Sequence, residues 1–488
     1  MHRAVITLKA AGTAIASTAR MRTTLAAALA SLFVIGLGCG FAGSPVSGGG
    51  AGVTPGGAQD IGLAREKIAN GIVPNPEDFA AEGLYSEHDL PLDGPPCTET
   101  LCLRAAAAVA PAVDTGEGEV FIQLGMSSNV DPATFQRPKL NAALVIDRSC
   151  SMEGGRFEDV KHAAKALVDR LGPDDLLTLV TFDERAKHEL GPKAVTDREA
   201  LKREIDALKI GGSTCIECGL KEAHARVKPK IDPSRQTRLF LFTDALPNVG
   251  ATGEGEFIDL LEKWGAKGVY VTTFGVGVDF GQELVTRMSK VRGANYFFLR
   301  DGEPVRKVFD EDFAFLVTPI AYDFGLALTP AAPLQLVASY GIPGEPGATS
   351  AQLSVSSLFL SRRRGAIVVR LRGDVQPQSQ LAQLQLGYTT DAQKTESLTV
   401  GYGEAAPVPE GGSWFGNAGI RKTVALTQFV IGARKVCELH QNGQVNEAMD
   451  LMGRTRALIE AEAAALGDAG LQQEAELAKA LHQLLGGP

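Results

Sequence analysis

Three oxygen-bearing side chains occupy alternate positions in the stretch ALVIDRSCSM, residues 143–152. Asp147, Ser149 and Ser151 follow directly after apolar residues that are typical of a buried strand. Oxygen donors in such a loop suit a hard cation or a phosphate, or they serve only as turn residues and helix caps. The rest of the chain must decide among these alternatives.

Two further oxygen-bearing residues stand in matching places. Asp244 follows the apolar stretch RLFLFT at 238–243, and Thr214 lies in the glycine-rich turn GGSTCIECGL at 211–220, just before a predicted helix. Open α/β sheets bind ligands at the carboxyl ends of their strands, so we expect these loops to converge. Two carboxylates and three hydroxyls, with no His or thiolate required, favour Mg²⁺ or Mn²⁺ over zinc.

Strand and helix patterns alternate between about residues 140 and 318. Near-continuous apolar strands are predicted at NAALVI, DLLTLVTF, RLFLFT, GVYVTTFGVG and ANYFFL. Helical spacing occurs in RFEDVKHAAKALVDRL, TDREALKREIDAL, CGLKEAHARV and GEFIDLLEKW. Buried strands separated by amphipathic helices predict an α/β fold, with a doubly wound, mostly parallel sheet covered on both faces.

The motifs in this region resemble those of a known family. DRSCS resembles the D-x-S-x-S motif of von Willebrand factor type A domains, their metal-ion-dependent adhesion site, and GGST and FTD resemble its second and third loops. FGVGVDFGQELVTRMSKVRGANYFF also resembles the last strand, helix and strand of bacterial members. Two positions depart from the family pattern, because Ala245 replaces a usual glycine and Cys215 a common asparagine.

The resemblance implies a metal site and a kind of partner. Direct metal ligands would be Ser149, Ser151 and Thr214, with Asp147 and Asp244 binding directly or through water. The implied cation is Mg²⁺, with Mn²⁺ or Ca²⁺ as alternatives. One coordination position would remain open for the acidic side chain of a protein ligand.

The flanking regions have other periods. Short strands with a period of two follow from about 319 to 404, and EVFIQLGMSS at 119–128 has the same character. These patterns predict a β-sandwich into which the α/β domain is inserted, followed by helices. The expected organisation is a signal and lipobox at 1–39, a tether at 40–60, an N-terminal region with the first sandwich strands at 61–139, the von Willebrand-type domain at 140–318, the sandwich at 319–410 and a helical region at 411–488.

The N-terminus has the layout of an export signal. Residues 1–38 contain no acidic residue and end in the apolar run LAAALASLFVIGLG, which is short for a membrane span. Either Met1 or Met21 can be the start. GLGCG resembles a bacterial lipobox, which implies a lipid on Cys39 and attachment to the cell envelope, although Gly36 replaces the usual leucine and plain secretion is the alternative. The Gly/Ser/Pro-rich stretch that follows is typical of a flexible tether.

Export makes disulfides the expected state of most cysteines. Cys97 and Cys102 are spaced for a local bond, and Cys437 is expected to be a buried thiol. Around the predicted metal site we expect a disulfide between two of three residues, with a redox pair or a zinc site as alternatives. These three are Cys150, Cys215 and Cys218.

Composition and motifs narrow the function. The net charge is −9, and the densest basic stretch is only SRRRG at 361–365, so no nucleic acid is expected as a partner. The chain contains neither H-E-x-x-H nor G-x-S-x-G, which argues against two common classes of hydrolase. We therefore expect a binding protein without enzymatic activity. The alternatives are a thiol-disulfide oxidoreductase that uses the C-x-x-C pair and a passive envelope protein that the metal stabilises.

Overall fold

The computed structural model describes residues 51–244, 254–277, 287, 291–299, 309, 312–341, 352–375, 379–390, 393–401 and 412–487. These residues belong to the unit Gly48–Pro488. The predicted signal, the lipidation site Cys39 and the first part of the tether lie outside the described residues. Among the helices in the described ranges, none is both long enough and apolar enough to cross a membrane.

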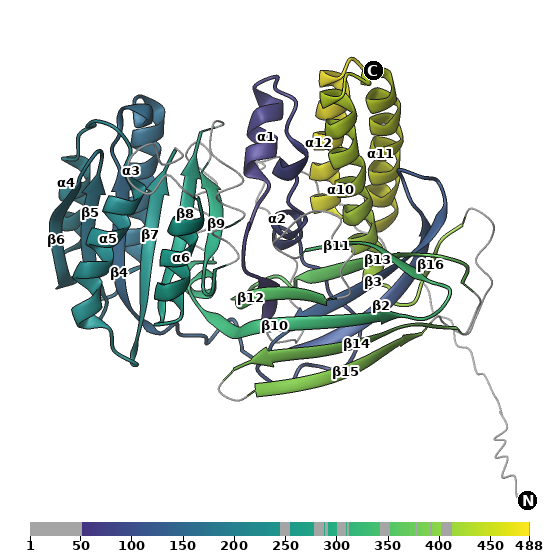
Figure 1. Ribbon diagram of the computed structural model, residues 1–488, viewed down its shortest axis with the longest axis horizontal. Helices are drawn as coiled ribbons and strands as arrows, with labels where there is room; N and C mark the ends of the chain where they lie inside the picture. The colour runs from purple at the N-terminus through teal and green to yellow at the C-terminus, as the bar shows by residue number, and fades with distance from the viewer. Residues whose placement is uncertain are drawn as a thin grey trace, which may run out of the picture. The chain divides into compact units, whose positions relative to one another are not determined.

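A six-stranded sheet forms the predicted α/β domain (Figure 1). Its order is β6-β5-β4-β7-β8-β9, and all neighbours are parallel except the edge strand β6, which runs antiparallel to β5. The strands are β4 (Lys139–Asp147), β5 (Leu176–Phe182), β6 (Ala186–Ala194), β7 (Arg235–Thr243), β8 (Val269–Val276) and β9 (Asn295–Leu299). The predicted fold class is confirmed, and β6 is a strand that the sequence analysis did not find.

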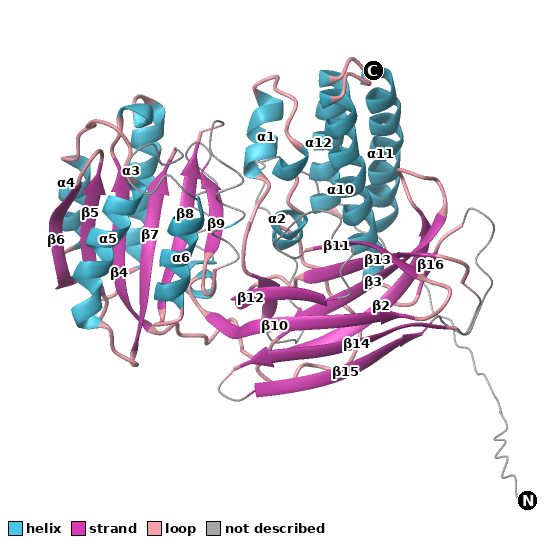
Figure 2. Ribbon diagram, in the orientation of Figure 1, coloured by secondary structure: helices cyan, strands magenta, loops and turns pink. Residues whose placement is uncertain are grey.

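Helices cover both faces of this sheet (Figure 2). Leu144 and Ile146 of β4 pack in one core with α3 (Gly155–Arg170) and α4 (Arg198–Asp206). Ala143 and Val145 point to the other face and pack with α5 (Ile216–Val227) and α6 (Glu254–Gly265). Burial on both faces explains why the strands are almost continuously apolar.

The flanking strands form one antiparallel sheet of ten strands. Its order is β11-β13-β3-β1-β12-β10-β14-β15, with β2 beside β3 and β16 beside β2. The strands are β1 (Gly52–Pro55), β2 (Cys102–Pro111), β3 (Gly118–Ser127), β10 (Pro319–Pro330), β11 (Gln335–Tyr340), β12 (Gln352–Ser361), β13 (Ala366–Arg372), β14 (Gln380–Thr389), β15 (Gln393–Gly401) and β16 (Trp414–Phe415). Because β3 precedes the α/β domain and β10 follows it, the domain is inserted in this sheet as predicted.

The predicted tether ends earlier than residue 60, and this changes the predicted sandwich. Strand β1 lies within the expected tether, and it pairs with β12 along its length and with β3 at Gly52. It thereby joins two groups of strands that would otherwise be separate sheets. The result is one continuous sheet, which still encloses a single core because side chains such as Ile122 of β3 and Leu384 of β14 share one cluster.

The segment after β1 also joins the second sheet. Ala58 forms a parallel bridge with Tyr296 of β9, where Tyr296 N donates to Gly57 O at 2.9 Å and Gln59 N donates to Tyr296 O at 3.0 Å. A side chain at Gly52 would collide with the carbonyl of Arg363, so the approach of β1 to β12 requires glycine there. Residues 52–59 therefore connect both sheets through backbone hydrogen bonds.

Three helices form the C-terminal region, as the sequence predicts (Figure 2). They are α10 (Ile420–Gln441), α11 (Val445–Leu466) and α12 (Ala469–Leu484). Two short helices near the N-terminus, α1 (Gly62–Ala69) and α2 (Ala81–Ser86), share their hydrophobic core. The rings of Phe79 and Phe429 meet edge-on in this core with centroids 6.0 Å apart. The remaining α-helix that lies wholly within the described residues is α9 (Phe313–Leu316).

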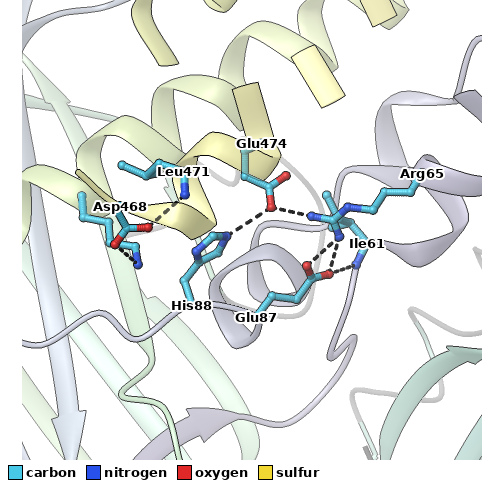
Figure 3. Close-up of polar contacts among 8 residues, drawn as sticks. Ile61, Arg65, Glu87, His88, Asp468, Leu471 and Glu474 are labelled. Carbon is cyan, nitrogen blue, oxygen red and sulfur yellow. Dashed lines mark hydrogen bonds and ion pairs between the residues drawn. The ribbon is translucent and has the colours of Figure 1, made fainter. Parts of the chain in front are cut away.

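A buried charge cluster fixes α1 to α12 (Figure 3). Arg65 donates to Glu87 at 2.6 Å and to Glu474 at 2.5 Å, and His88 Nε2 lies 3.3 Å from the same Glu474 oxygen. The Glu474 side chain is only 1% exposed. Burial alone would raise the pKa of Glu474, but the charge of Arg65 and the contacts with His88 outweigh it and lower that pKa.

Replacement of Glu474 by glutamine is expected to lower the free energy of unfolding by roughly 3 kcal/mol at neutral pH, because it leaves a buried arginine with one partner fewer. Folding lowers the pKa of Glu474 from its ordinary value of 4.5. The ionised side chain therefore makes its full contribution to the free energy of unfolding above pH 4.5, and this contribution is lost as the pH falls through the pKa of the folded state. Denaturant unfolding of both proteins at pH 7 and pH 3 measures the difference, which should shrink at pH 3. Glu476→Gln, a change in a side chain that is 78% exposed on the same helix, is the control. An equal difference in the free energy of unfolding at both pH values would contradict a lowered pKa of Glu474.

Candidate metal-binding site

The predicted site residues lie where two central strands end. Asp147 is the last residue of β4 and Thr243 the last of β7, and the parallel register pairs Ile146 with Phe242. The loops that carry Ser149, Ser151 and Asp244 therefore leave the sheet side by side.

Three oxygens of this edge lie in direct contact. Ser149 Oγ is 3.0 Å from Ser151 Oγ, and Ser151 Oγ donates to Asp244 Oδ1 at 2.8 Å. Oxygens bound to Mg²⁺ at about 2.1 Å in an octahedron stand about 3 Å apart along each edge. The spacing of these donors thus fits a small hard cation with little movement.

Asp147 organises the loops. It is buried, with Oδ1 accepting from the backbone N–H of Ser149 at 2.9 Å and Oδ2 from Thr243 Oγ1 at 2.6 Å. Burial raises the pKa of Asp147 to about 6, although the hydrogen bonds from Thr243 and Ser149 oppose this rise, and the charge of Asp244 adds to it. Because both of its oxygens already accept hydrogen bonds, the geometry favours contact with a cation through water.

Backbone hydrogen bonds hold the Thr214 loop against the serine loop. Cys150 N donates to Gly212 O at 2.8 Å, and Gly211 N donates to Arg148 O at 2.5 Å. Thr214 itself is 2% exposed at the start of α5. The structure thus brings together the three predicted loops. Ala245, where the family pattern has glycine, lies outside the described residues.

Asp183 has a positioning role that the sequence analysis missed. Its carboxylate accepts from Arg148 Nη2 at 2.5 Å, and its carbonyl accepts from Cys215 N at 2.7 Å. A side chain at Gly211 would collide with the Asp183 carboxylate. Asp183 therefore connects the serine loop with the Thr214 loop, and nothing in the local sequence distinguishes it from an ordinary strand-end acid.

Arg156, in the first turn of α3, is a second residue that the sequence analysis missed. Its Nη1 lies 3.1 Å from Asp244 Oδ2, and its side chain is 34% exposed. The contact joins residues that are far apart in sequence, so no motif pointed to it. Arg156 places a fixed positive charge beside a predicted metal ligand.

Two disulfides form among the described cysteines. Cys97 pairs with Cys102, and Cys215 with Cys218, so the predicted local bond and the predicted bond near the site are both present. Of the three cysteines near the site, Cys150 is the one that remains a thiol. It is exposed, and its Sγ donates to Gly211 O at 2.8 Å. Cys437 is a buried thiol, as predicted.

Comparison with known proteins gives the family of this domain. Residues 142–246 match the von Willebrand factor type A domain family. The chain contains a von Willebrand factor type A domain. VWA domains generally mediate protein interactions and typically bind a divalent cation at the adhesion site. No group of three or more His, Cys, Asp and Glu side chains suited to a metal occurs in the described part of the chain.

Relatives share this domain and parts of its flanks. An uncharacterised protein of Synechocystis sp., sll0103, is 42% identical over 124 residues, which are 25% of this chain and 29% of that protein. The uncharacterised protein YfbK of Escherichia coli is 25% identical over 266 residues, 53% of this chain and 46% of that protein. The chain thus spans less than half the length of either relative.

A solved structure extends the likeness beyond the VWA domain. A von Willebrand factor type A protein from Catenulispora acidiphila has a TM-score of 0.51 and 13% identity, over 78% of this chain and 89% of that one. At this identity the comparison concerns the fold alone, and it supports the same architecture for most of the chain.

The arrangement of sulfurs predicts how the native protein reacts with iodoacetamide. We expect rapid labelling of the peptide that contains Cys150, because this thiol is exposed, and none of the peptide that contains Cys437. Burial raises the pKa of Cys437 to about 12, so this cysteine should react only after unfolding. Mass spectrometry of native and denatured samples measures both, with Cys150→Ser as the control. Native labelling of Cys215 or Cys218 would contradict the disulfide.

Proposed function

We propose that this protein is a non-catalytic adhesion or binding protein of the bacterial cell envelope. It engages the acidic side chain of a protein partner through a divalent cation held by the VWA site. Lipid attached to Cys39 tethers it to the membrane, on the periplasmic or the external side.

The contacts among oxygens at the carboxyl ends of β4 and β7 are the main support for this proposal. Ser149, Ser151 and Asp244 would hold the cation directly, with Thr214 beside them and Asp147 acting through water. Hydroxyl donors contribute no charge, so a cation bound here stays electrophilic and accepts a further carboxylate. A binding site that is completed by its partner needs no nucleophile or general base.

The donor types also favour one class of cation. Two carboxylates and three hydroxyls are hard oxygen ligands, which suit Mg²⁺ and Mn²⁺ and include no thiolate or imidazole for a softer metal. We therefore propose Mg²⁺, with Mn²⁺ or Ca²⁺ as alternatives.

The buried position of Cys215 argues against the oxidoreductase alternative. In a reactive C-x-x-C pair the attacking sulfur must be accessible, but Cys215 is 0% exposed and disulfide-bonded to a half-buried Cys218. The bond lies at the start of α5, directly after Thr214, so its simplest role is to fix the metal loops.

The metal proposal predicts a cation-dependent stability. Saturating Mg²⁺ or Mn²⁺ should raise the melting temperature relative to a chelator, because a ligand that binds only the folded state at about 100 times its Kd adds about 2.7 kcal/mol. Asp147→Ala should abolish the increase. Thermal melts of both proteins with each cation and with EDTA measure it.

Asp174→Ala is the matched control for that experiment. Asp174 lies just before β5, at the amino-terminal ends of the parallel strands and away from the candidate site. Its side chain is 70% exposed, so this variant should keep the full cation response. If saturating cation leaves the wild-type melting temperature unchanged, the metal site fails. If Asp147→Ala only destabilises the protein and partner capture persists, the passive structural alternative is favoured.

The proposed lipid anchor predicts a change of compartment. Cys39→Ser in the full chain should move the protein from the membrane fraction to the soluble fraction, because this change removes the thiol that would carry the lipid. Fractionation followed by immunodetection measures it, and Cys150→Ser serves as a cysteine control. Membrane retention of the Cys39 variant would contradict lipid attachment at this residue.

A further inference from the structure

A cavity of about 270 Å³ lies where the VWA sheet meets the ten-stranded sheet. Residues of β8, β9 and α9 line it from the VWA domain, and residues of β1 and β12 line it from the large sheet. The helices α2 and α12 contribute further lining residues. Because a cavity of about 150 Å³ is enough to hold benzene, this one has room for a molecule of one or two rings.

Aromatic side chains form much of the cavity wall. Four of the lining residues are phenylalanines that are each at most 7% exposed, namely Phe297, Phe298, Phe315 and Phe359. Phe297 is held by a neighbour, since its ring centroid lies 5.6 Å from that of Phe274 in a stacked pair. Flat apolar surfaces of this kind suit a ligand with a flat apolar body.

Arg363 supplies a positive charge to the lining from the turn between β12 and β13. Its side chain is 34% exposed, and its Nη1 lies 3.5 Å from Asp312 Oδ2. This separation is longer than a charge-assisted hydrogen bond, which is about 2.7–2.9 Å. Within the described residues it is the one side-chain contact of the guanidinium, so the other N–H groups of Arg363 can donate to a ligand.

Two acids of the lining are already engaged by donors of the protein. Both carboxylate oxygens of Glu87 accept from Arg65 (Figure 3). Asp60 accepts from the backbone N–H of Gly62 with Oδ1 and from that of Phe298 with Oδ2. These contacts leave the two carboxylates less available to a cationic ligand than Arg363 is to an anionic one.

A second arginine lies behind the cavity wall. Arg238 is 0% exposed, and its Nη1 donates to Thr272 Oγ1 at 2.8 Å and to Gly293 O at 3.0 Å. Asn295 and Phe359, which also contact it, line the cavity. No carboxylate of the described residues contacts this guanidinium. Burial lowers the pKa of Arg238 to about 10, so it stays charged at neutral pH and makes the potential near the cavity more positive.

We propose that this cavity is a second ligand site, which binds a small aromatic carboxylate. The ring of the ligand lies against the phenylalanine side chains, and its carboxylate accepts hydrogen bonds from Arg363, whose planar fork suits this group. The charge of Arg238 adds to the attraction for an anion. None of the predicted metal ligands lines the cavity, so this site does not depend on the proposed cation.

Calorimetric titration of the full chain with naphthoate tests the proposal. Naphthylmethanol and naphthylmethylamine are the neutral and cationic probes of similar shape, and naphthoate should bind at least tenfold more tightly than either. Arg363→Gln should weaken naphthoate binding about tenfold, because it removes a charged donor, and Arg363→Lys should restore part of the affinity. Gln473→Trp should also weaken it, because this exposed lining residue of α12 then narrows the cavity.

Two matched variants should bind naphthoate as the wild-type protein does. Gln472→Trp changes the neighbouring exposed residue of α12, which is not part of the lining. Arg292→Gln removes an arginine that is 36% exposed and pairs with Asp323 instead of a cavity residue. Melting temperatures verify that each variant is folded.

Three outcomes would overturn the proposal. Equal binding of the three probes, or tighter binding of the amine, would exclude an anionic ligand class. Naphthoate binding that both Arg363→Gln and Gln473→Trp leave unchanged would mean that the probe binds elsewhere. If no probe binds the wild-type protein, the cavity is not a ligand site of this kind.

Discussion

The four-residue strand β1 is the constraint on which the rest of the architecture depends. It lies between β3 and β12, and the residues that follow it bridge to β9 of the VWA sheet. One short segment thus completes the large sheet and is bridged to the edge of the smaller one at Tyr296. An uncovered edge strand exposes a row of unpaired backbone groups, and this bridge occupies part of the β9 edge.

The candidate site is built on the central strands of the VWA sheet. β4 is paired on both sides, and its last residue, Asp147, is held by Thr243 from the neighbouring strand. Backbone hydrogen bonds then fix the Thr214 loop to the serine loop, and Asp183 and the Cys215–Cys218 bond fix that loop further. The three loops are therefore held together by contacts within the protein itself. Such preorganisation is what the proposed cation-binding function requires.

Much of this structure could be predicted because the relevant signals are local. The buried strands β4, β5, β7 and β8 have near-continuous apolar runs, and Asp147, Ser149, Ser151 and Asp244 all lie within a few residues of a strand end. Three of the strands that escaped prediction have a clear physical reason. β1 has the Gly-rich composition of a tether and gains its order from a distant partner, β2 is half alanine, which has low strand propensity, and the edge strand β6 contains Gly191 and Pro192.

The same distinction explains which residues of the candidate site could be predicted. Asp147, Ser149, Ser151, Thr214 and Asp244 were predicted from their motifs, and their assignment as metal ligands stays a prediction. Arg156 and Asp183 make contacts that join separate loops, and such contacts leave no characteristic spacing in the sequence. Among the cysteines, spacing predicted the bond between Cys97 and Cys102, but only the structure decided which residue near the site remains a thiol.

The place of β1 has a consequence for the order in which the molecule assembles. The N-terminal segment finds its partners late in the chain, as in the pair of Arg65 and Glu474, which are 409 residues apart in sequence. Contacts of such long range are slow to form, because a large loop must close before they contribute. β1 cannot complete its pairing until β12 has been synthesised, so this early segment is among the last parts of the large sheet to become ordered. Until then, other proteins that act on an extended chain can reach it.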